Sequence, residues 1–150
     1  MFARLLLAWD GSPPARRALD LAISLARTYG SEIVAASIAS SPTHAETEED
    51  RRESVDAARQ FLEASFARVR DRAERAGVAI EQVIIESDEP AEAIVQYAHD
   101  EAVDLVVVGH HRGRRRPGRL FLHGLADRLA TRSDVAVLVT SDLDSERERR

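Results

Sequence analysis

Short apolar runs alternate with amphipathic helical stretches along the whole 150-residue chain. Apolar residues repeat at helical spacing over 13–29, 48–76, 88–98 and 120–130, which predicts four helices. The apolar runs before, between and after them predict buried strands at residues 5–9, 32–38, 78–86, 105–108 and 135–139. Strands that alternate with helices through short links require right-handed crossovers and a parallel sheet covered on both faces. The sequence therefore predicts a single doubly wound α/β domain with a five-stranded parallel sheet.

The boundaries of the predicted helices carry recognisable start and stop residues. Ser12 is suited to cap the first helix, and the two prolines that follow it suit the first helical turn. Gly30 is expected to end this helix, and Gly77 to end the long second helix. Trp9 is expected to belong to the core, since it ends a buried strand.

Composition excludes several functions. All 21 basic residues are Arg, so lysine-dependent chemistry such as Schiff-base formation is excluded, and the absence of Cys excludes thiol nucleophiles and disulfides. The net charge of −5 disfavours nucleic acid as a partner. The N-terminal apolar run is far shorter than the ~20 residues of a membrane span and has no signal-peptide pattern, so we expect no membrane association and a cytoplasmic location.

Two residues at strand ends are candidates for a binding site. Asp10 follows the first predicted strand and Gly109 follows the fourth, and ligands of doubly wound sheets bind outside the carboxyl ends of strands where the strand order reverses. The glycines from Gly109 onward could let backbone N–H groups approach a phosphate. They could equally relieve backbone strain in a tight strand-to-helix connection, and Asp10 could simply cap the turn into the first helix.

The loop after Gly109 is rich in arginine and histidine. Its guanidinium groups suit phosphate binding, or they form a solvated charged loop; both interpretations remain open. His110 and His111 are adjacent and would point to opposite sides of an extended stretch, and no carboxylate or Cys stands at metal-ligand spacing near them. We therefore predict no metal site.

Three segments resemble the universal stress protein family: LLLAWDGS at 5–12, DLVVVG at 104–109, and the closing stretch from ADRL at 126–129 to VLV at 137–139. The resemblance covers nearly the whole chain. It implies a Rossmann-like fold of the adenine nucleotide alpha hydrolase type with strand order 3-2-1-4-5. It also implies a domain over 1–141, followed by a charged C-terminal tail at 142–150.

The resemblance also implies a nucleotide site. In that family the first strand's aspartate and the second strand's backbone hold the adenosine, and the motif G-x2-G-x9-G-(S/T) holds the phosphates in the ATP-binding branch. This chain has three residues between its first two glycines, and His123 occupies the position of the third glycine, which gives G-x3-G-x9-HG. The candidate nucleotide-binding residues are Ala8, Asp10, Ile38, Gly109, His110, Arg112, Gly113, His123, Gly124 and Leu125.

Three functions remain open at this stage. The first is a homodimeric stress-response module that binds ATP, AMP, cAMP or another adenine nucleotide, with Mg²⁺ if the ligand is a triphosphate. The second is a dimer that binds no nucleotide and acts through protein partners, and the third is a slow ATPase. No residue is assigned a catalytic role. The dimer interface is expected at the last strand, through Val135, Val137 and Val139, because an apolar edge strand tends to pair with another chain.

Overall fold

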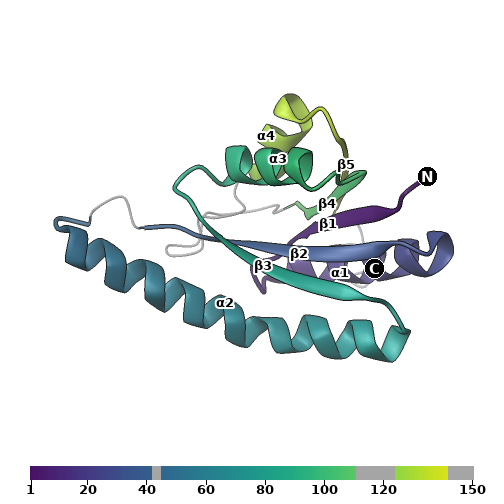
Figure 1. Ribbon diagram of the computed structural model, residues 1–150, viewed down its shortest axis with the longest axis horizontal. Coiled ribbons are helices and arrows are strands. Elements are labelled where there is room, and N and C mark those ends of the chain that lie inside the picture. Colours follow the sequence, from purple (N-terminus) through teal and green to yellow (C-terminus); the bar gives the residue numbers. More distant parts are fainter. Residues whose placement is uncertain (42–44, 111–123, 142–150) are drawn as a thin grey trace, which may run out of the picture.

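In the computed structural model, residues 1–41, 45–110 and 124–141 are described, and they form one parallel five-stranded sheet in the order β3-β2-β1-β4-β5 (Figure 1). The strand order and the α/β class are those predicted from the sequence. In chain order the elements are β1 (Arg4–Ala8), α1 (Pro13–Tyr29), β2 (Glu32–Ala39), α2 (Glu48–Ala76), β3 (Ile80–Glu86), α3 (Pro90–Asp100), β4 (Leu105–Gly109), α4 (Leu125–Arg132) and β5 (Ala136–Thr140).

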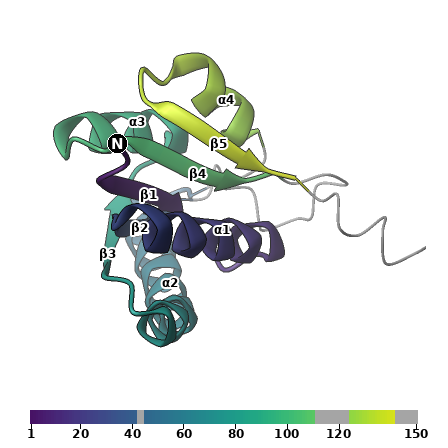
Figure 2. The ribbon, with the colours of Figure 1, turned by 90° about the vertical axis from the view of Figure 1, so that its right-hand side faces the viewer.

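The helices cover both faces of the sheet, with α1 and α2 on one face and α3 and α4 on the other (Figure 2). From β1 the chain winds outward through α1 and α2 to the edge strand β3. It then returns through α3 to β4 and continues through α4 to β5, the other edge. Because each crossover is right-handed, the change of direction between β3 and β4 puts α3 and α4 on the face opposite to α1 and α2.

The predicted boundaries that fall on described residues agree with the structure to within two residues; the third helix begins at Pro90 rather than residue 88, and two strands begin later than predicted. Ser12 caps α1 by accepting a 3.3 Å hydrogen bond from the backbone N–H of Ala15. The third strand begins at Ile80 rather than residue 78, because the N–H of Val78 is used to close the end of α2. The last strand begins at Ala136 rather than residue 135, because the N–H of Val135 donates to Ser133 Oγ at 3.1 Å in the turn that precedes the strand. Residues 120–123 of the predicted fourth helix lie outside the described residues.

The core lies around the two central strands. Residues Leu5 to Leu7 of β1 and Val106 to Val108 of β4 are fully buried, as expected for parallel strands covered on both faces. Trp9 is 2% exposed, which confirms its predicted place in the core. The core thus fixes the positions of the strand ends, and a site at this edge of the sheet is built from those ends.

Candidate functional site

The carboxyl ends of the central strands are staggered at the point where the strand order reverses. Ala8 is the last residue of β1 and pairs with Ala36, whereas β2 continues three residues further to Ala39. On the other side, β4 runs on to Gly109. The end of β1 is therefore set back between its neighbours, at the position where doubly wound sheets bind their ligands.

Polar contacts hold the turn that leaves β1. The backbone N–H of Trp9 donates to the carbonyl of Ala36 at 2.9 Å, and its own carbonyl accepts from the hydroxyl of Ser37 at 2.8 Å. The indole Nε1 of Trp9 donates to Ser65 Oγ on α2 at 3.0 Å. Three hydrogen bonds thus fix Trp9, and with it the position of Asp10, the next residue.

Asp10 is half-buried and shapes the start of α1. Its Oδ1 accepts a 2.9 Å hydrogen bond from the backbone N–H of Ser12, and Gly11 between them adopts a left-handed φ of 78°. This confirms the turn-capping interpretation of Asp10. A carboxylate held in this way keeps a defined orientation beside the recessed end of β1.

Gly109 has a steric role that the sequence analysis did not identify. A Cβ added to Gly109 would lie 2.4 Å from the carbonyl oxygen of Pro14 and 2.5 Å from its carbonyl carbon. The atoms nearest to this Cβ therefore belong to the backbone of Pro14 at the start of α1. A side chain at Gly109 could displace that backbone only at a high energetic cost. Glycine is needed here because the first turn of α1 packs directly on the end of β4.

The remaining candidate residues fall into three sets: those at the strand ends, those at the start of α4, and those outside the described residues. Ala8 and Ile38 are buried at the ends of β1 and β2, and His110 is half-buried, its backbone N–H donating to the Thr140 carbonyl at 2.9 Å. Gly124 caps α4 with a left-handed φ of 75°, and Leu125 turns its side chain into the core. Arg112, Gly113 and His123 lie outside the described residues.

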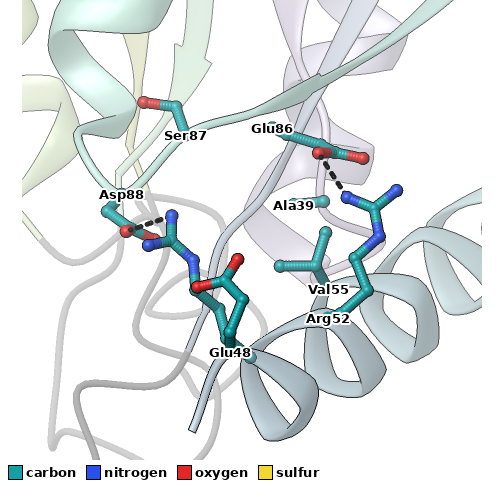
Figure 3. A pocket seen from close by; sticks show the side chains of 8 residues that line it. Ala39, Glu48, Arg52, Val55, Glu86, Ser87 and Asp88 are labelled. Carbon is teal, nitrogen blue, oxygen red and sulfur yellow. Dashed lines mark hydrogen bonds and ion pairs between the residues drawn. The ribbon is translucent and has the colours of Figure 1, made fainter. Parts of the chain in front are cut away.

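A cavity of about 300 Å³ lies beside these strand ends, between the first turns of α2 and the ends of β2 and β3 (Figure 3). Charged side chains cross its mouth in ion pairs: Arg52 and Arg59 contact Glu86 at 3.3 and 2.9 Å, and Arg51 contacts Asp88 at 3.1 Å. We call these five side chains the ionic latch. The cavity is lined by Ala39, Glu48, Arg51, Arg52, Val55, Glu86, Ser87 and Asp88.

The two carboxylates of the latch are stabilised in their charged form. The hydrogen bond from Arg59, supported by the charge of Arg52, holds the pKa of Glu86 below its usual range. Hydrogen bonds from the hydroxyl and the backbone N–H of Ser41, followed by the charge of Arg51, lower the pKa of Asp88. Both groups therefore remain ionised to a lower pH than an unperturbed carboxylate.

Sequence reasoning missed the latch. In the sequence, the arginines of α2 are spaced as on any solvent-exposed helix face. Only the folding of the sheet places the end of β3 next to them. Among the described residues no group of three or more His, Asp or Glu side chains is placed to hold a metal ion. None of the helices in that part of the chain is long and apolar enough to span a membrane.

The topology and the recessed strand end define a doubly wound α/β domain of the Rossmann-like class. A family model described as the universal stress protein family matches residues 1–141, and the chain belongs to this family. This confirms the resemblance found in the sequence.

Individual relatives agree with this assignment. A universal stress protein encoded in the 3′ region of a sulfhydrylase gene of Thermus aquaticus is 32% identical, over 93% of this chain and 98% of that protein. The crystal structure of a family member from Burkholderia pseudomallei is 26% identical, with a TM-score of 0.76 over 93% of this chain and 96% of that one. A universal stress protein crystallised in complex with cAMP is 25% identical, with a TM-score of 0.70 over 93% and 97%.

Proposed function

We propose that this chain binds an adenine nucleotide at the carboxyl ends of β1, β2 and β4, and that the bound nucleotide is its signal in a stress response. The recessed end of β1 at the switch point carries the proposal. It leaves the last residues of β2 without a β1 partner, next to the oriented carboxylate of Asp10. A relative of similar fold holding cAMP supports the same class of ligand.

The proposed contacts follow from the chemistry of each group. The carboxylate of Asp10 would accept hydrogen bonds from the ribose hydroxyls, and the backbone of Ile38 would contact the base. The backbone N–H groups at Gly109 and at the start of α4 would face the phosphates, because helix N-termini favour anions. Arg112, Gly113 and His123 would complete the phosphate site, with Mg²⁺ if a triphosphate is bound.

A second function is favoured by a specific observation. Gly109 and Asp10 both have structural roles that need no ligand. Gly109 leaves room for the first turn of α1, and Asp10 caps the turn that precedes α1. A homodimer that binds no nucleotide and acts through protein partners would keep both residues. The two proposals therefore differ only in whether a nucleotide binds.

Binding can be measured by the fluorescence of Trp9, which is the sole tryptophan and the residue before Asp10. Nucleotide-free protein is titrated with ATP, ADP, AMP and cAMP, with and without Mg²⁺, while fluorescence and thermal melting are followed. Ligand a hundredfold above its dissociation constant should stabilise the protein by about 2.7 kcal/mol. Flat curves for every nucleotide in both readouts would refute the proposal and favour the ligand-free dimer.

A matched pair of variants separates binding from folding. Asp10→Asn keeps an oxygen that can accept from Ser12 but removes the charge, whereas Asp10→Ala removes both. We expect Asp10→Asn to melt near the wild type and to bind nucleotide about tenfold more weakly, since a charge-assisted hydrogen bond is lost. Unchanged affinity in Asp10→Asn would exclude the Asp10 carboxylate from the site.

We also propose that the protein is a homodimer through β5. This strand lies at the edge of the sheet, Ala136 is exposed, and Val139 is 38% exposed. Exposed apolar edge strands pair readily with a second copy. Of the three residues predicted for this interface, Val137 and Val139 lie in β5, whereas Val135 precedes it.

A further inference from the structure

The first turns of α2 are held to the sheet differently from the rest of the helix. Among residues 48–59 only Val55 is buried, whereas the following turns bury Leu62, Phe66, Val69 and Ala73. Val55 belongs to a small apolar cluster with Ala39 and Leu62 that is separate from the main core. Apolar burial therefore anchors α2 from Leu62 onward and contributes little to its first three turns.

Ion pairs hold these turns instead. The ionic latch links them to Glu86 at the end of β3 and to Asp88 before α3. Its members are accessible to solvent: Glu86 is 35% and Arg52 63% exposed in their side chains. Exposed ion pairs are individually weak and are screened by salt, so the strength of this attachment depends on ionic strength.

Four of the five latch side chains line the cavity: Arg51, Arg52, Glu86 and Asp88. The cavity interrupts the packing of these turns on the strand ends, where the apolar contact is limited to the small cluster of Val55, Ala39 and Leu62 with Ala58 and Ile84 against it. Figure 3 shows Arg52 reaching across it toward Glu86 while Val55 lies at its wall. Moving these turns away from the sheet would therefore break the three ion pairs and open only the small apolar cluster around Val55 and Ala39.

We infer that residues 48–59 form a flap over the ends of β2 and β3, closed at low ionic strength and released as salt screens the latch. The inference does not depend on nucleotide binding. Release would expose the end of β2 at Ala39, which is part of the cavity wall and adjoins Ile38. The protein would thereby present a different surface at high and low salt without unfolding.

The absence of cysteine from the chain provides a direct test. Val55→Cys and Val69→Cys each introduce one thiol on α2, the first on the buried face of the flap and the second in the main core. Their rates of labelling with an uncharged maleimide are compared at about 0.01 M and about 1 M NaCl, between which the Debye length falls from about 30 Å to about 3 Å. Each rate is normalised to that of the urea-unfolded chain at the same salt.

We expect Val55→Cys to label on the order of tenfold faster at high salt and Val69→Cys to label at an unchanged rate. When Arg51→Gln and Arg59→Gln are added to the Val55→Cys variant, Cys labelling should already be fast at low salt. Arg75→Gln is the matched control, because it breaks an ion pair with Asp71 within the helix itself. Equal labelling of Val55→Cys at both salts, an equal increase at Val69→Cys, or slow labelling in the latch variants would each overturn the inference.

Hydrogen exchange on the unsubstituted protein provides a second readout that is independent of the cysteines. We expect the amides of residues 48–59 to exchange several-fold faster at high salt, with those of residues 62–73 unchanged. If salt changed the exchange rates of both segments by the same factor, or of neither, the flap would be contradicted. This readout holds even if Val55→Cys fails to fold.

Discussion

Gly109 at the end of β4 lies against the backbone of Pro14 at the start of α1, so closely that a Cβ on Gly109 would be 2.4 Å from the Pro14 carbonyl oxygen. The contact joins the two elements that flank the proposed site. It accounts for a glycine at this position whether or not a phosphate binds nearby. A test of nucleotide binding should therefore avoid substitutions at Gly109.

Gly109→Ala is expected to destabilise the protein by about 1–3 kcal/mol, because α1 or β4 must shift to admit the methyl group. Gly30→Ala is the control: Gly30 has a left-handed φ of 67° but no atom within 4 Å of an added Cβ. It should cost about 1 kcal/mol from backbone strain alone. Urea unfolding measures both. Wild-type stability in Gly109→Ala would show that the approach of Pro14 is not a constraint.

Ser65→Ala is expected to destabilise the protein by about 1–2 kcal/mol and to change the emission of Trp9. The variant leaves the indole N–H of a residue that is 2% exposed without its acceptor, and a buried donor without a partner is costly. Ser54→Ala, on the same helix, serves as the control and should leave the emission unaltered. Equal emission spectra for Ser65→Ala and wild type would show that the hydrogen bond between Trp9 and Ser65 does not hold the turn at Asp10 in place.

Acid should weaken the contribution of the latch to stability. Because the pKa values of Glu86 and Asp88 are lower in the folded protein than in the unfolded chain, their contribution is fully present above the ordinary carboxylate pKa. It is lost as the pH falls through the lowered values. Urea unfolding of wild type and a Glu86→Gln, Asp88→Asn variant should differ at neutral pH and converge in acid. A difference that persists at a pH below both folded pKa values would contradict this linkage.

Val139→Lys is expected to convert the proposed homodimer into a monomer, as seen by sedimentation velocity, because a charge on an edge strand opposes pairing with a second copy. The fold should change little, within about 0.5 kcal/mol, since Val139 is 38% exposed. Phe61→Lys removes an apolar side chain that is 60% exposed on α2 and should leave the dimer intact. Dimerisation that survives Val139→Lys and is lost in Phe61→Lys would move the interface to α2.

The sequence alone determined the order of elements, the parallel sheet and the family. These follow from local patterns: the apolar runs, the cap at Ser12 and the stop at Gly30 are written in neighbouring residues. Asp10 was located as a strand-end residue for the same reason, and its role as a turn cap needs only the residues beside it. Where local signals decide the structure, the sequence can be interpreted without knowledge of the fold.

Only the tertiary structure decided the roles that depend on distant partners. Gly109 is needed because Pro14, 95 positions earlier, packs on it, and Ser65 matters because it meets Trp9. The latch pairs α2 with the end of β3 in the same way, and nothing in the spacing of its arginines indicates which carboxylates they meet. Such contacts are set by how the sheet orders its strands and seats its helices, which no local pattern encodes.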